Sequence, residues 1–151
     1  LDAQKPVKYD IEIKKYYPIR STHANNYCWK LLGLLAEKQS KTKGEITKED
    51  LYKEYIRRFG KVSEVTLINE AVESFIQAWT SKGSGLGWLV EKVAVTETDT
   101  TLWCYHGSSS FNSKEMYEFI LGIVDDCKLE GIETRTPEEI AQMRGIREPG
   151  K

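Results

Sequence analysis

The residues best suited to metal chemistry lie on one short alternating segment near the N-terminus. Glu12 and Lys14 flank Ile13 and match the Glu-x-Lys half of a metal-dependent nuclease signature. The two-residue period of a strand places both side chains on one face, as that chemistry requires. Only Asp2 and Asp10 precede them as acidic partners, and alternating Glu and Lys is also typical of an exposed strand face. A small metal nuclease is therefore the third of three functional hypotheses.

Two histidines and two glycine-rich stretches are the remaining candidates for chemistry. His23 is expected in the first turn of a helix, and His106 ends a strand, where it could hydrogen-bond a loop. The glycines of Gly83-x-Gly85-x-Gly87 follow a helix and precede a strand, the reverse of a phosphate-binding loop, and predict a helix stop and turn. The Gly107-Ser108-Ser109-Ser110 stretch precedes a helix but has no evident base partner. We expect no catalytic set, no metal and no cofactor.

Composition predicts one globular domain. The 151 residues are 40% hydrophobic and 30% charged, which is typical neither of disordered nor of membrane proteins. No segment approaches the ~20 apolar residues of a membrane helix, and no apolar signal core is evident at the start of the chain. Cys28, Cys104 and Cys127 have no metal-like spacing and predict buried, reduced thiols in a cytoplasmic protein. We expect a single domain over 1–151, with its core in 7–143 and a frayed tail in 144–151.

Charge is distributed unevenly along the chain. Residues 1–61 hold 14 Lys and Arg against 8 Asp and Glu, a net charge of +6, whereas residues 62–151 hold 8 against 15, a net charge of −7. The basic half could face an anion such as nucleic acid, and the acidic half a protein partner. Two solvated faces that balance one another are the simpler interpretation.

Hydrophobic periodicity predicts eight elements. A half-buried strand is expected over 7–16, where apolar and charged residues alternate. Helices are expected from the Ser21 or Thr22 cap to Lys38, from the Thr47 cap to a left-handed Gly60, over 69–82, from Asn112 to Gly131, and from Thr136 onward. Strands at 88–95 and 101–106 form a hairpin, and 39–45 is a polar loop.

Two helix starts carry especially clear capping patterns. Asn112 is followed three residues later by Glu115, and Thr136 by Glu139, which is the spacing of a capping box. The resulting order, β-α-α-α-β-β-α-α, does not alternate as in a parallel doubly wound fold. We therefore predict an α+β domain with a small, mostly antiparallel, three-stranded sheet covered by amphipathic helices.

The residues that open the first helix carry a family resemblance. Arg20, Ser21, Asn25 and Trp29 form the pattern R-S-x-x-x-N-x-x-x-W, which resembles the NinB/Orf family of phage recombination proteins. The similarity spans roughly 7–143 and is greatest to the versions carried by phages of Gram-positive hosts. The other stretches that carry it are Trp79…Gly85-Leu86-Gly87-Trp88, Gly107-Ser108-Ser109, Lys114-Glu115-Met116, Gly131-Ile132-Glu133-Thr134 and Thr136-Pro137-Glu138-Glu139.

The resemblance implies a homodimeric, non-catalytic recombination mediator in the host cell cytoplasm. Such a protein would bind single-stranded or gapped DNA, engage single-strand-binding protein and help load a recombinase. Single-strand binding uses cations along a groove and rings on which bases stack, and the basic half has both. The candidate nucleic-acid-binding residues are Arg20, Ser21, Asn25, Lys30, Arg57, Arg58 and Lys61.

Simpler roles stand beside these assignments. Trp29 is expected to pack rather than to bind, and Asn25 could cap or brace a strand. The cations at 57, 58 and 61 lie where a helix ends, so a favourable interaction with the helix dipole would also explain them. The second functional hypothesis is a protein-binding phage adaptor that acts on a host factor through the acidic half.

Overall fold

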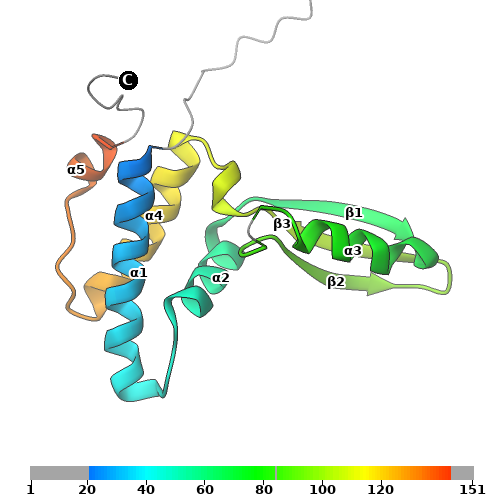
Figure 1. Ribbon diagram of the computed structural model, residues 1–151, viewed down its shortest axis with the longest axis horizontal. Coiled ribbons are helices and arrows are strands. Elements are labelled where there is room, and N and C mark those ends of the chain that lie inside the picture. The colour runs from blue at the N-terminus through cyan, green and yellow to red at the C-terminus, as the bar shows by residue number, and fades with distance from the viewer. Residues whose placement is uncertain (1–20, 84, 144–151) are drawn as a thin grey trace, which may run out of the picture.

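The chain forms two units of different construction (Figure 1). The computed structural model describes residues 21–83 and 85–143. We call helices α1, α2, α4 and α5 the helical unit, and strands β1, β2 and β3 with helix α3 the sheet unit. In chain order the elements are α1 (Thr22–Lys43), α2 (Lys48–Phe59), β1 (Val62–Ile68), α3 (Val72–Thr80), β2 (Leu89–Val95), β3 (Asp99–Tyr105), α4 (Ser113–Leu129) and α5 (Pro137–Ala141).

Side-chain caps define where the helices begin. The hydroxyl of Ser21 accepts a hydrogen bond from the backbone N–H of Ala24, which starts α1. Full capping boxes open α2 at Thr47, α4 at Asn112 and α5 at Thr136, because each cap and the acidic residue three positions later satisfy one another's backbone N–H. The capping predicted at Asn112 and Thr136 is thereby confirmed.

The main core lies in the helical unit. Helix α1 packs against α4 and α2, and Figure 1 shows α1 and α4 side by side. Apolar residues at steps of three and four along each helix point into this contact, which removes them from water almost completely. The fully buried members with the largest side chains include Leu31, Leu32, Leu35, Tyr55, Ile56, Met116, Phe119, Ile120 and Ile123.

The sheet unit is a three-stranded antiparallel sheet with one covered face. Strand β3 lies between β1 and β2. Helix α3 packs on one face over a small core whose buried members are Val72, Leu102 and Cys104. The opposite face stays open, since Ile68 is 58% exposed and Trp103 41% exposed. The fold class, α+β with a small antiparallel sheet, is confirmed; among residues 21–83 and 85–143, the helix that packs along the sheet is α3, and it covers one face.

One strand was missing from the sequence prediction. Strand β1 (Val62–Ile68) pairs with β3 along its whole length, so the described order is α-α-β-α-β-β-α-α. Its two faces both carry apolar residues, with Val65 and Leu67 toward α3 and Val62 and Ile68 toward solvent. The polar–apolar alternation that marks a half-buried strand is therefore absent. The predicted strand over 7–16 and the tail over 144–151 lie outside the described residues.

The end of the first helix and the conformation of Gly60 were predicted wrongly, whereas the helix predicted over 69–82 is largely confirmed. The polar loop over 39–45 is partly helical, because α1 continues to Lys43 and stops at Gly44, which has a φ of 86°. Gly60 ends α2 in extended rather than left-handed backbone, and it is needed because a Cβ there would lie 2.5 Å from the carbonyl oxygen of Ile56. The predicted helix over 69–82 is a short 3-10 turn followed by α3. The hairpin is confirmed, as β2 and β3.

Candidate nucleic-acid interface

Two of the predicted site residues at the start of α1 belong to the packing of the helix. The hydroxyl of Ser21 donates to the carbonyl oxygen of Met143 at 2.9 Å while it caps the helix. Asn25 is half-buried, and its backbone N–H donates to the Ser21 carbonyl at 3.1 Å. Ser21 therefore ties α1 to the segment after α5. Arg20 lies outside the described residues.

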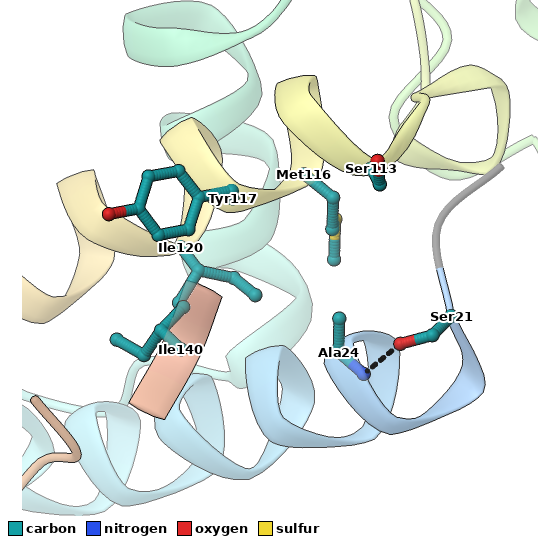
Figure 2. Close-up of a pocket in the computed structure, with 7 residues that line it drawn as sticks. All are labelled: Ser21, Ala24, Ser113, Met116, Tyr117, Ile120 and Ile140. Carbon is teal, nitrogen blue, oxygen red and sulfur yellow. Dashed lines mark hydrogen bonds between the residues drawn. The ribbon is translucent and has the colours of Figure 1, made fainter. Parts of the chain in front are cut away.

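The gap between the first turns of α1 and α4 is filled by side chains. Figure 2 shows Ala24 and Met116 facing one another across it, with Ile120 and Ile140 to one side. It has no room for a water molecule. Ser113 is 2% exposed, and its Oγ has no hydrogen-bond partner among the described residues. Ala24 and Met116 close the contact between the helices, so this gap is not a ligand site.

Trp29 packs, as its position predicted. Its ring stacks on that of Tyr52, with centroids 4.7 Å apart and an interplanar angle of 25°. Tyr52 in turn lies edge-on to Phe119 of α4, with centroids 6.1 Å apart. The motif tryptophan thus contributes to the contact between α1, α2 and α4.

The predicted basic cluster at the end of α2 is paired with acids from the second half of the chain. Arg57 contacts Glu91 at 3.0 Å, Arg58 contacts Asp126 at 2.7 Å, and Lys61 contacts Glu115 at 3.4 Å. The basic and acidic halves of the sequence are therefore interleaved in space. All three cations already have an anionic partner, which a phosphate would have to displace.

The Arg58 pair is the most strongly held of the three. Asp126 also accepts a hydrogen bond from the Tyr55 hydroxyl at 2.6 Å. Burial opposes the charge of Asp126, but the hydrogen bonds from Tyr55 and Arg58 outweigh it and hold its pKa below the usual value. The Arg58 guanidinium lies over the rings of Tyr55 and Phe59, 5.2 and 4.8 Å from their centroids. This cluster joins α2 to α4.

A different set of cations is open to solvent. His23, Asn26, Tyr27 and Lys30 of α1 line an open depression of about 200 Å³ together with Arg135, which precedes α5. We call it the α1 depression. All but Tyr27 are exposed. No ion-pair partner of Lys30 or Arg135 is found in 21–83 and 85–143.

Tyr27 holds Arg135 in place. The Tyr27 hydroxyl accepts a hydrogen bond from the Arg135 backbone N–H at 2.9 Å. The Arg135 guanidinium lies over the Tyr27 ring, 5.1 Å from its centroid. A cation on a ring keeps its N–H donors available, so Arg135 can still donate to a phosphate.

Of the six predicted binding residues that the structure describes, Lys30 alone lines this depression. Asn25 is one position from Asn26 but is not among the lining residues. Spacing could have found part of the site, because His23, Asn26 and Lys30 recur at steps of three and four on one helix face. Nothing in the sequence links them to Arg135, which is brought there by the path of the chain between α4 and α5.

The groups considered for catalysis are occupied structurally. His106 bonds the Ser63 hydroxyl of β1 through Nε2, at 2.8 Å. The hydroxyl of Ser110 donates to the Gly107 carbonyl at 2.8 Å, and the Ser108 N–H donates to the Tyr52 hydroxyl at 2.8 Å. These bonds satisfy the loop before α4, as expected for short polar side chains. Glu12 and Lys14 lie outside the described residues.

Cys28, Cys104 and Cys127 are buried, as predicted, and no disulfide joins any two of them. Burial, with a smaller effect from Asp126, raises the pKa of the Cys127 thiol to about 11. Across 21–83 and 85–143, no three His, Cys, Asp or Glu side chains gather as a metal site would require. None of the helices in these residues has the length and apolar character of one that crosses a membrane.

No family model, no curated protein and no solved structure matches the chain.

Proposed function

We propose that the protein is a non-catalytic mediator of phage recombination that binds single-stranded or gapped DNA. In this proposal it acts as a homodimer with single-strand-binding protein to assist recombinase loading, as the resemblance to the NinB/Orf family implies. The observation that carries the DNA-binding part is the α1 depression. It combines exposed cations with an exposed amide, which are groups that contact phosphates.

Charge favours the α1 depression over the end of α2 as the phosphate contact. A phosphate that approaches Arg57 or Arg58 meets a carboxylate already in place at 3.0 or 2.7 Å. A phosphate that approaches Lys30 or Arg135 meets no acidic side chain among those that line the depression. The net attraction is therefore greater at the depression. We therefore assign the phosphate contact to the face of α1 beside Arg135 and not to the cations at the end of α2.

Salt dependence of DNA binding tests this assignment. The double variant Lys30→Gln/Arg135→Gln is compared with the wild type by fluorescence anisotropy on a single-stranded oligonucleotide of roughly 16 nucleotides. Each phosphate contact contributes about −0.7 to the slope of log K against log salt concentration. We expect the slope to become shallower by about 1.4 when both contacts are lost.

A matched control removes two positive charges elsewhere. Arg57→Gln/Lys92→Gln has the same net charge as the test variant, and both residues are exposed and paired with acids. It should keep the wild-type slope. An equal change of slope in the two variants would show that overall charge, and not the depression, attracts the DNA, and a flat salt response of the wild type would contradict the proposal.

A second function, that of a protein-binding adaptor, is favoured by one observation. The open face of the sheet exposes Val62, Ile68 and Trp103, and the neighbouring Glu64 accepts a hydrogen bond from the Trp103 indole N–H at 3.2 Å. An aromatic residue among exposed apolar side chains is typical of protein interfaces. A pulldown from nuclease-treated host lysate separates the functions, because an adaptor retains a partner without nucleic acid and loses it in Trp103→Ser.

A further inference from the structure

A cluster of three rings lies where the sheet unit meets the helical unit. Trp79 ends α3, Trp88 precedes β2, and His106 follows β3. The Trp79 and Trp88 rings meet edge to face, with centroids 5.5 Å apart and an interplanar angle of 70°. The His106 ring lies 5.1 Å from Trp79 and 5.6 Å from Trp88. The sequence did not lead us to expect a ligand contact at Trp79, Trp88 or His106.

Backbone contacts hold both tryptophans rigidly. The indole N–H of Trp79 donates to the Tyr105 carbonyl at 2.9 Å. Trp88 packs so closely on Gly107 that a Cβ there would lie 2.6 Å from the indole nitrogen. The glycines at 83 and 87, with φ values of 55° and 90°, give the left-handed turns that bring Trp88 back onto this position. The glycine-rich stretch therefore positions an aromatic ring.

One cation lies over both tryptophans. The Lys82 ammonium is 5.0 Å from the centroid of Trp79 and 5.5 Å from that of Trp88. Lys82 is exposed, and both rings are half-buried. The ring faces nearest the ammonium are therefore covered by the Lys82 side chain, which is itself open to solvent. Lys82 has no ion-pair partner within the described ranges. The cluster thus combines two rigid rings with an available positive charge.

We propose that this cluster, Trp79, Trp88 and Lys82, is a second contact for single-stranded nucleic acid, in which a base stacks on an indole and Lys82 pairs with the adjoining phosphate. Stacking on aromatic rings together with cations along the backbone is how proteins bind single strands without sequence preference. The site rests on the proposed function, and it adds base contact to the phosphate contact at the α1 depression.

Charge decides between a nucleotide and a cationic ligand at these rings. Two indole faces near an ammonium also resemble a site for a methylated amine. A cationic ligand would have to displace the Lys82 ammonium from the two rings, and Lys82 would repel it. A ligand that joins a flat ring to a negative charge instead gains from both the indoles and Lys82.

Comparison of two oligomers of equal length tests the proposal. One is oligothymidylate, and the other is the same sugar–phosphate chain without bases. Because stacking contributes about 1–3 kcal/mol per base, we expect the wild type to bind oligothymidylate about fivefold or more tightly. Trp88→Leu should lose this preference. Lys82→Gln should weaken the binding of both oligomers and make the salt slope shallower by about 0.7.

Trp103→Leu is the matched control, because Trp103 lies on the open face of the sheet. It should retain the full preference for oligothymidylate. Equal wild-type affinity for both oligomers would overturn the stacking site, as would loss of the preference in Trp103→Leu. If Trp88→Leu does not fold, the stacking site is still tested by the wild-type affinities for the two oligomers and by the salt slope of Lys82→Gln.

The results also separate this proposal from the proposed function. Absence of binding to either oligomer would overturn both. Base-independent binding that still depends on Lys30 and Arg135 would overturn only the stacking site. A base preference carried by Trp88, with no change of salt slope in Lys30→Gln/Arg135→Gln, would overturn only the assignment of the α1 depression.

Discussion

The core of the helical unit is almost completely buried, and its exposed apolar side chains, Leu34, Phe59 and Leu129, lie outside that core, whereas the sheet unit leaves many of its apolar side chains half-exposed. Leu31, Leu32 and Leu35 of α1 are each at most 1% exposed. In the sheet unit, Phe75 and Trp79 of α3 are only partly buried against a core of three residues. A single helix on one face of a small sheet cannot exclude water from its own flanks, while α1, α2 and α4 cover one another.

This difference has a functional consequence. A rigid helical unit suits the α1 depression, because Lys30 projects from a helix whose opposite face is held in the core. The sheet unit leaves the rings of Trp79 and Trp88 half-buried and that of Trp103 exposed, whereas a fully packed fold would have buried all three. Rings that keep contact with solvent are the groups most available to a base or to a protein partner.

The largest predicted effect tests the difference in packing directly. Leu32 and Leu102 are both 0% exposed, but Leu32 lies in the helical core and Leu102 in the small core under α3. Leu32→Ala should lower the free energy of unfolding toward the upper end of the ~2–5 kcal/mol range for such changes, and Leu102→Ala toward the lower end, because half-exposed neighbours can close the cavity. Urea denaturation measures both, and equal losses would contradict the comparison.

The second prediction concerns the charged contact that joins α2 to α4. Asp126→Asn should cost about 1.5–3 kcal/mol at pH 7, because it weakens charge-assisted hydrogen bonds from Tyr55 and Arg58. The folded pKa of Asp126 lies below its unfolded value, so the unfolded chain binds the proton first as pH falls. The stabilisation is therefore present above about pH 4 and is lost as pH falls through the folded pKa.

Urea unfolding of the wild type and Asp126→Asn between about pH 7 and about pH 3 measures this dependence. The gap between the two proteins should narrow below about pH 4. Glu54→Gln is the control, because Glu54 lies 3.8 Å from the same guanidinium and is exposed, and it should change stability by less than ~0.5 kcal/mol. A constant gap across this pH range would refute the assignment.

The third prediction sharpens the comparison at the junction of the units. A Cβ on Gly107 would collide with Trp88, whereas nothing lies within 4 Å of a Cβ on Gly33 in α1. Gly107→Ala should destabilise the protein by about 1–3 kcal/mol and change tryptophan fluorescence. Gly33→Ala should stabilise it by about 0.5–1 kcal/mol, because alanine favours helix. Thermal unfolding of both variants checks the opposite signs, and a shared sign would contradict the account.

The smallest predicted effect is at an exposed pair between the units. Arg57 of α2 and Glu91 of β2 form an ion pair 3.0 Å long in which both side chains are more than a third exposed. Arg57→Gln should therefore change the free energy of unfolding by less than about 1 kcal/mol, and less again in high salt. Urea denaturation at low and high salt measures this change in the free energy of unfolding. A large loss of stability would mean that the Arg57–Glu91 pair, and not the packing of Trp88 on Gly107, holds the two units together.

Local chemistry explains which parts of the fold the sequence predicted. The caps at Asn112 and Thr136 were found because a capping box is complete within four residues. The hairpin of β2 and β3 was found because its strands are joined by a short polar turn. Strand β1 was missed because Val62 and Ile68 place apolar side chains on its solvent face, so the apolar and polar residues do not alternate. The sequence does not show that this face of the sheet is open.

The candidate site divides in the same way. Lys30 was found from the basic first half of the chain, and its neighbours His23 and Asn26 follow from helical spacing. Arg57, Arg58 and Lys61 were predicted as candidate nucleic-acid-binding residues, and each has a carboxylate partner more than 30 residues away in the sequence. Sequence counts charges along the chain, whereas binding depends on which charges remain unpaired in space.

By itself the sequence determined the fold class, most helix starts, the hairpin and the burial of the three cysteines, because each follows from periodicity or from contacts between near neighbours. Only the tertiary structure decided that β1 pairs with β3 and that the cations at the end of α2 lie beside carboxylates. It also decided that Lys30 and Arg135 line one depression and that the rings of Trp79, Trp88 and His106 lie together. These depend on where distant segments return to one another, which the packing of the whole chain sets and no local pattern records.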